Sequence, residues 1–113
     1  MYLENSIITS MKKQISSVHA FHEAFGINNE SAPVGAVDEK TYALRYELMR
    51  EENEEYLEAV QKGDLVEIAD ALGDMMYILC GTILSHGLQD VIEDVFEEIQ
   101  RSNMSKLDEN GEP

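Results

Sequence analysis

Acidic side chains stand on two adjacent predicted helices at positions where a folded core normally places apolar ones. Glu52 and Glu55 continue a stripe at helical spacing whose other members, Leu44, Leu48 and Ala59, are apolar or small. A neighbouring stripe on the same helix is acidic throughout, which is typical of a solvated face. It consists of Glu47, Glu51, Glu54 and Glu58. Glu51 borders the inward pair, because residues three and four apart are neighbours on a helix.

The next helix carries a second inward set of carboxylates. At 100° per residue, Glu67, Asp70 and Asp74 fall within an arc of about 60°. Nearly all other positions between residues 65 and 79 are apolar, and a helix that is apolar almost all round is typically buried. Glu67 has an alternative role, because it follows Asp64 by three residues and this spacing forms a capping box at a helix start.

Four inward carboxylates, Glu52, Glu55, Asp70 and Asp74, would repel one another strongly if they met between the two helices. Each pair about 5 Å apart costs roughly 3 kcal/mol at an effective dielectric constant of 20. The six pairs together exceed the stability of a typical domain, about 5–15 kcal/mol. The repulsion must therefore be relieved by raised pKa values or bridging cations, unless the side chains do not meet. Carboxylate oxygens suit Mg²⁺ or Mn²⁺. A di-iron bundle would need Glu-x-x-His pairs, which the three histidines do not provide.

The elements that position these residues are helical. Helical periodicity predicts helices over about residues 6–25, 38–62, 64–86 and 89–104, with a loop over 27–37 and no strand. Short connections after the first helix predict one all-α domain over residues 1–113, an antiparallel bundle of about four helices. The polar tail begins at about residue 105.

Composition excludes several kinds of partner for this 113-residue chain, whose formal charge is −15. Nucleic-acid polymers and polybasic membrane anchoring both need clustered Lys and Arg. The most apolar stretch, residues 75–84, is shorter than the about 20 residues of a membrane span. Cys80 is the only cysteine, which favours a reducing cytoplasm. A chain this short has a thin core, so we expect help from a partner subunit.

The acidic motifs resemble those of the MazG-like and phosphoribosyl-ATP pyrophosphohydrolase-like all-α NTP pyrophosphohydrolases. The signature of that superfamily is EExxE followed by ExxD on the next helix. Residues 51–55 supply the first part, and residues 67–70 read as the second. Asp74 precedes Met-Met-Tyr, as the motif aspartate precedes an apolar-apolar-Tyr sequence in relatives. The similarity extends over most of the chain, through the segments 18–26, 70–88 and 101–113.

The resemblance implies Mg²⁺-dependent hydrolysis of an NTP or dNTP to the monophosphate and pyrophosphate, in housecleaning or control of the nucleotide pool. Two or more Mg²⁺ ions, or Mn²⁺, would bind to the carboxylates, and Glu51 would help to orient the attacking water. The implied ligands are Glu52, Glu55, Asp70 and Asp74, with Glu67 as a further candidate. The implied assembly is a homodimer, or a homotetramer made from dimers.

The segment RSNMSK near the end of the last helix supplies the basic residues that such a site needs. Arg101 can grip phosphate with two hydrogen bonds and Lys106 can act as a point charge, while Asn103 could contact phosphate or base. The alternative is an ordinary helix end, where basic residues complement the helix dipole.

Two other functions stay open. One is phosphoribosyl-ATP hydrolysis in histidine synthesis, and the other is a non-catalytic helical oligomer that binds a divalent metal or a nucleotide. The sequence does not select the base or the sugar.

Overall fold

The computed structural model describes residues 10–107 and 109–113, which form four helices and no strand. These are α2 (Ser10–Phe25), α3 (Glu39–Lys62), α4 (Leu65–Ser85) and α5 (Ile92–Met104). The expected all-α fold is confirmed. Residues 6–9 of the first predicted helix lie outside the described residues.

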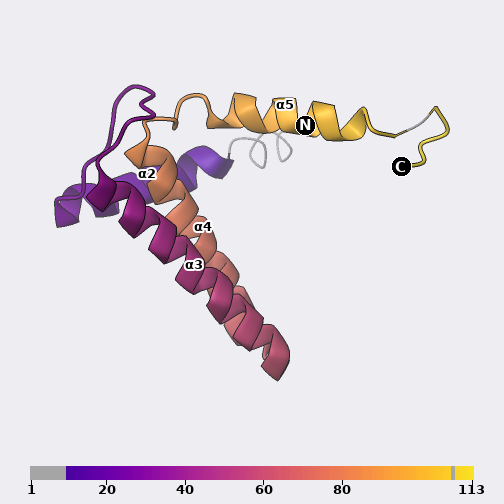
Figure 1. The fold of residues 1–113 in the computed structure, drawn as a ribbon, viewed down its shortest axis with the longest axis horizontal. Helices are drawn as coiled ribbons and strands as arrows, with labels where there is room; N and C mark the ends of the chain where they lie inside the picture. The colour runs from indigo at the N-terminus through magenta and orange to yellow at the C-terminus, as the bar shows by residue number, and fades with distance from the viewer. Residues whose placement is uncertain (1–9, 108) are drawn as a thin grey trace.

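Helices α3 and α4 form an antiparallel hairpin joined by a tight turn (Figure 1). Asp38 caps α3 by accepting a hydrogen bond of 2.7 Å from the Thr41 amide. Gly63 ends that helix in the left-handed conformation, with φ 67°, which glycine adopts without steric cost. Asp64 then caps α4 by accepting a bond from the Glu67 amide. The capping signals in the sequence therefore fix the hairpin.

Helix α2 crosses α4, and the small core lies at this crossing. It consists of Ile15, Val18, Cys80 and Leu84, with Met11 and Ile92 packed against them. Much of α4 outside this region is exposed, including Leu65 at 77% of its surface. The expectation that α4 is buried all round is therefore wrong for the single chain. Apolar periodicity indicates that a helix face favours burial, but it does not show that the rest of the chain covers that face.

A buried arginine links α3 to α4 at the end of the hairpin opposite the Gly63 turn. Arg45 is 7% exposed, and it donates hydrogen bonds to the Thr82 hydroxyl at 3.1 Å and the Ile78 carbonyl at 2.9 Å. The helices approach closely here because Gly81 has no side chain; a Cβ there would lie 2.5 Å from the guanidinium. Leu44, predicted to face the core, is 53% exposed. The inward stripe of α3 thus begins one residue later than the sequence suggested.

The loop between α2 and α3 is tied to the end of α4. The amide of Val34 donates to the His86 carbonyl, and His86 Nδ1 donates to the Val34 carbonyl, both at 2.9 Å. Gln89 donates to the Glu30 carbonyl at 2.8 Å, so residues 88–91 form a turn and α5 begins three residues later than predicted.

By length and composition, α4 could also cross a membrane, a property that core helices of soluble proteins share. The most apolar stretch, residues 75–84, is by itself too short for a membrane span. A stretch of 18 residues within α4 is nevertheless long and apolar enough, although the helix as a whole carries three carboxylates.

Candidate metal centre and its surroundings

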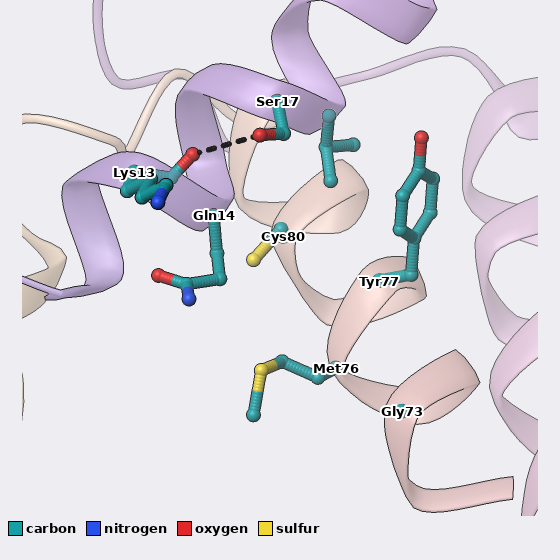
Figure 2. Close-up of a pocket in the computed structure, with 8 residues that line it drawn as sticks. Lys13, Gln14, Ser17, Gly73, Met76, Tyr77 and Cys80 are labelled. Atoms are coloured by element: carbon teal, nitrogen blue, oxygen red, sulfur yellow. Dashed lines mark hydrogen bonds between the residues drawn. The ribbon is translucent and has the colours of Figure 1, made fainter. Parts of the chain in front are cut away.

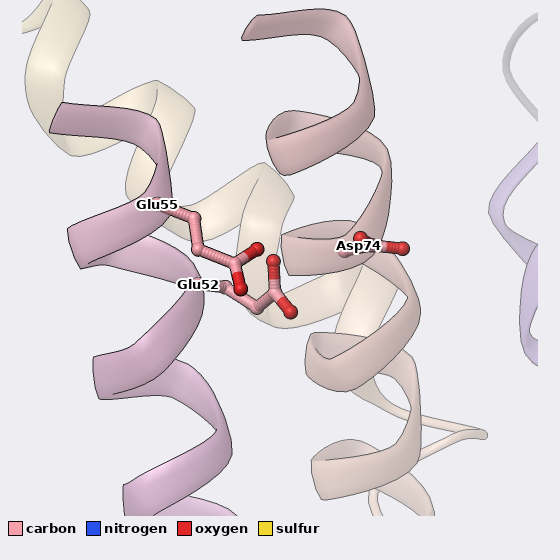
Figure 3. A group of neighbouring side chains, drawn as sticks. All are labelled: Glu52, Glu55 and Asp74. Carbon is pink, nitrogen blue, oxygen red and sulfur yellow. The ribbon is translucent and has the colours of Figure 1, made fainter. Parts of the chain in front are cut away.

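Three of the predicted site residues meet halfway along the hairpin. Glu52 and Glu55 extend from α3 and Asp74 from α4, and one carboxylate oxygen of each lies within 4.8 Å of the others (Figure 3). Glu52 is half-buried, whereas Glu55 and Asp74 are exposed. The helical spacing predicted this meeting, because it placed both carboxylate stripes on the facing sides of the two helices.

Glu52 is the strained member of this carboxylate group. Its Oε2 atom is buried and has no hydrogen-bond partner. Burial first, and then the negative charges of Glu55 and Asp74, together raise the pKa of Glu52 from its ordinary value of 4.5 to about 7. Glu52 therefore lacks a positively charged partner, because such a partner would lower its pKa and could satisfy its buried oxygen.

The donor set fits a hard divalent cation. All three side chains offer carboxylate oxygens, as Mg²⁺ and Mn²⁺ prefer, and the orphaned oxygen of Glu52 is available for coordination. A bound cation would remove both the desolvation cost and the repulsion that raise this pKa. The side chains present therefore match the ion that the sequence suggested.

Asp70 and Glu67 lie nearer the start of α4 than Asp74 and do not belong to the three convergent carboxylates. The charge of Asp70 reaches Glu52 and contributes to its raised pKa. Both residues line a hollow of about 240 Å³ together with Glu55. Glu67 also forms an ion pair of 3.6 Å with Lys62, and its amide is the one that Asp64 caps. Only half of the predicted capping box therefore forms, because the Asp64 amide donates to the Ala59 carbonyl at 3.1 Å and the Glu67 side chain pairs with Lys62 at the border of the site.

Lys62, at the end of α3, is a basic residue beside the site that the sequence pattern did not single out. It lines the same hollow as Glu55, Glu67 and Asp70, which makes it a basic side chain beside the predicted ligands. The signal that could have revealed it is its position immediately before the Gly63 turn, since a tight turn places the end of one helix beside the start of the next.

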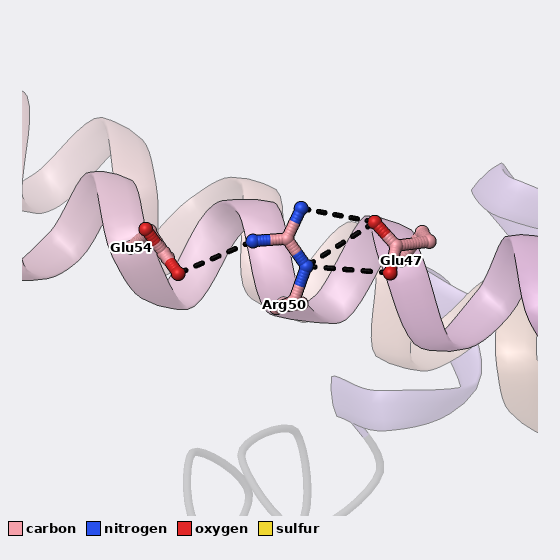
Figure 4. Close-up of polar contacts among 3 residues, drawn as sticks. All are labelled: Glu47, Arg50 and Glu54. Carbon is pink, nitrogen blue, oxygen red and sulfur yellow. Dashed lines mark hydrogen bonds and ion pairs between the residues drawn. The ribbon is translucent and has the colours of Figure 1, made fainter.

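Glu51 does not join the carboxylate group. It is exposed and belongs to the outer side of α3, where Arg50 bonds Glu47 at 2.9 Å and Glu54 at 3.2 Å (Figure 4). The outer stripe is thus a solvated face with its own basic partner, as predicted. A role for Glu51 in orienting water stays a prediction.

The three predicted phosphate-binding residues lie at the far end of α5. Arg101 pairs with Glu98, and Lys106 donates to the Asn103 side chain at 3.1 Å. All three are exposed, and α5 runs away from the hairpin that holds the carboxylates (Figure 1). The single chain therefore separates the basic and acidic halves of the predicted site.

A further hollow of about 190 Å³ lies between α2 and α4, on the side of α4 that carries Gly73 and Tyr77 (Figure 2). Gln14 lines it, and its Oε1 atom is buried without a hydrogen-bond partner. An amide oxygen in this state could accept a hydrogen bond from a ligand.

Comparison with known proteins agrees with these features. Residues 18–103 match the model of the phosphoribosyl-ATP pyrophosphohydrolase family. An uncharacterized protein of Acanthamoeba polyphaga mimivirus is 32% identical over 71 residues, which are 63% of this chain and 28% of the viral protein. No solved structure matches the chain. The family match includes both helices of the carboxylate group, so the chain belongs to the phosphoribosyl-ATP pyrophosphohydrolase family, within the MazG-like all-α NTP pyrophosphohydrolase superfamily.

Proposed function

We propose that the protein is a Mg²⁺-dependent nucleoside triphosphate pyrophosphohydrolase that converts an NTP or dNTP to the monophosphate and pyrophosphate. Family membership implies a pyrophosphohydrolase. The observation that carries the proposal is the convergence of Glu52, Glu55 and Asp74, with one buried oxygen left unsatisfied. These carboxylates lower the stability of the metal-free protein, and binding of a cation would explain why they are grouped there.

In the proposed reaction, water adds to the α-phosphorus while the bond between that phosphorus and the bridging oxygen of pyrophosphate breaks. The carboxylate group would hold the metal, with Asp70 beside it. Bound Mg²⁺ would neutralise part of the about four negative charges of a triphosphate and activate the water. Glu52 and its neighbours repel any anion that arrives alone, so they restrict the site to metal-bound substrates.

A second substrate, phosphoribosyl-ATP, is favoured by the family description itself. It carries the same triphosphate, so the carboxylate group would act on it in the same manner. Discrimination would come from whatever holds the base and the second ribose phosphate.

We also propose that the protein works as a homodimer or as a homotetramer built from dimers. The support is the large number of exposed apolar side chains on α3, α4 and α5. Monomers rarely leave such broad apolar surface uncovered.

The test is pyrophosphate release from a panel of NTPs, dNTPs and phosphoribosyl-ATP, with Mg²⁺ and with EDTA. We expect Glu52→Gln and Asp74→Asn to lower the rate by at least about 100-fold, because each removes a charged ligand from the metal. Glu54→Gln is the matched control, since it makes the same change on the outer face of α3. Native rates in both site variants would refute this site. Binding of nucleotide without release of pyrophosphate would favour the non-catalytic alternative.

A further inference from the structure

The hairpin that carries the carboxylate group is held together at two separate places. On α3 the buried residues are Arg45 and Ala59, and on α4 no residue is buried between Ala71 and Cys80. The carboxylate group lies within this gap, where its charges repel one another in the absence of a cation. The spacing of the two helices at the metal ligands therefore depends on the contacts at either end of the gap.

Arg45 forms the contact at the end of the gap away from the Gly63 turn. It donates one hydrogen bond to the Thr82 hydroxyl at 3.1 Å and another to the Ile78 carbonyl at 2.9 Å. The Thr82 hydroxyl donates to the same Ile78 carbonyl at 2.9 Å, so both acceptors are held in place on α4. Hydrogen bonds from one planar guanidinium to two fixed points set both the position of α3 along α4 and its rotation.

The guanidinium is itself held where three helices meet. A Cβ added at Gly81 would lie 2.5 Å from Arg45 Nη2 and 3.0 Å from His22 Nε2, so α2, α3 and α4 converge at this point. The His22 ring is bonded in turn to Asn29 through Nδ1, at 2.7 Å. Cys80, the neighbour of Gly81 in the chain, belongs to the core between α2 and α4. The contact made by Arg45 therefore has little freedom to shift.

Helical spacing connects this contact to the metal ligands on both helices. Glu52 follows Arg45 by seven residues, about two turns and 10 Å along α3, so the two side chains share one face. Asp74 precedes Ile78 by four residues, about one turn and 6 Å along α4. Both connecting stretches are continuous helix, so a slide or rotation at Arg45 would move Glu52 relative to Asp74.

The fold by itself does not need a charged side chain at residue 45. Among residues 10–107 and 109–113, no carboxylate forms an ion pair with Arg45, and it is costly to bury a charge that has no counter-charge. An apolar side chain of similar length would fill the space without that cost. What an apolar side chain lacks is a directed hydrogen bond, and fixing register is the best-attested use of buried polar groups.

We propose that Arg45 is a positioning residue for the metal centre: by fixing the register of α3 on α4, it holds Glu52 and Asp74 within reach of one divalent cation. The proposal rests on the proposed function and adds the residue that prepares the site before the metal arrives. Residues that orient metal ligands from outside the coordination shell typically change metal affinity by about 10- to 100-fold when they are replaced. We therefore expect replacement of Arg45 to affect metal binding more than folding.

Arg45→Met tests the proposal, because Met fills similar space but donates no hydrogen bond. Metal affinity is measured without nucleotide, by calorimetric titration with Mg²⁺ and by the electron paramagnetic resonance signal of free Mn²⁺. We expect both dissociation constants to rise by about tenfold or more, while the free energy of unfolding in EDTA is unchanged or higher. Arg50→Met is the matched control on the exposed face of α3, and it should bind both metals as wild type does.

Thr82 provides a second pair of variants, which decides the question if Arg45→Met does not fold. Thr82→Val keeps the shape of the side chain but removes the hydroxyl that accepts from Arg45, whereas Thr82→Ser keeps that hydroxyl. Metal binding should weaken in Thr82→Val and stay near native in Thr82→Ser. Thr82→Val combined with Arg45→Met should bind no more weakly than Arg45→Met alone, because both substitutions remove the same contact.

Pyrophosphate release separates this inference from the proposed function. Arg45→Met should be slower than wild type at limiting Mg²⁺, and saturating Mg²⁺ should restore most of its rate because the ligands themselves remain. If wild type hydrolyses no nucleotide, the proposed function fails, whereas the metal titrations still test the role of Arg45. Native metal affinity in Arg45→Met and Thr82→Val would overturn the inference. A loss of affinity that Thr82→Ser shares, or that only accompanies a matching loss of folding stability, would overturn it as well.

Discussion

Replacing Glu52 with glutamine should stabilise the metal-free protein while removing its response to Mg²⁺. The structure supplies the reason, since the ionised form of Glu52 is disfavoured by burial and by Glu55 and Asp74. Glutamine has nearly the same shape and carries no charge. We therefore predict that the metal-free protein has a lower free energy of unfolding with Glu52 than with glutamine at this position.

The magnitude follows from the pKa. A rise from 4.5 to about 7 corresponds to an upper limit of about 3 kcal/mol, at 1.36 kcal/mol per pKa unit. Exposed neighbours are screened by water, which lowers the expected effect to about 1–2 kcal/mol. Because the folded pKa is the higher one, the folded state binds more protons between pH 4.5 and 7. The free energy of unfolding of the wild type therefore falls as pH rises through that window.

The assay is chemical unfolding in EDTA at several pH values and at one protein concentration. Wild type and Glu52→Gln should agree near pH 4.5, and the variant should be more stable by about 1–2 kcal/mol at pH 8. With Mg²⁺ at 100 times its dissociation constant, wild type should gain about 2.7 kcal/mol and the variant much less, so their order reverses. Glu54→Gln should follow wild type throughout. Equal stability in EDTA at pH 8, or equal gains from Mg²⁺, would refute the reasoning.

Three further outcomes are expected. Gly81→Ala should cost about 1–3 kcal/mol of stability in chemical unfolding, because its Cβ would lie 2.5 Å from Arg45, whereas Gly73→Ala, with nothing within 4 Å, should cost nothing. Burial and the charge of Arg45 lower the pKa of His22, so the contribution of His22 to stability should diminish as pH falls below 6.5, opposite in sign to that of Glu52, and a His22→Gln variant should lack this contribution in chemical unfolding. Phe96→Glu should shift sedimentation toward the monomer if α5 is covered by a second copy, and an unchanged assembly would contradict that arrangement.

Local chemistry in the sequence predicts the hairpin and its carboxylates well. Asp38, Gly63 and Asp64 begin and end helices where their capping preferences place them. Because the helical period is regular, it also turns Glu52 and Asp74 toward each other. These features depend on neighbours within a few residues, which is the range at which a sequence pattern carries physical information.

Features that depend on distant neighbours were missed. Arg45 reads as an ordinary surface residue, yet it is buried because Thr82 and Ile78, more than 30 residues away, accept its hydrogen bonds. Leu65 reads as a core residue, yet it is exposed in the single chain. In both cases the sequence shows what a side chain prefers, but it does not show which distant residues, if any, satisfy that preference.

The two glutamate stripes of α3 differ in whether a basic partner or water compensates their charges. On the outer face, Glu47 and Glu54 share Arg50 and remain in water, so their charges cost little. On the inner face, Glu52 has a buried oxygen without a partner, although replacement by an apolar residue would relieve the strain. The acidity of the chain as a whole therefore says little about activity. The informative carboxylate is Glu52, whose buried oxygen lacks the positive partner that the proposed cation would supply.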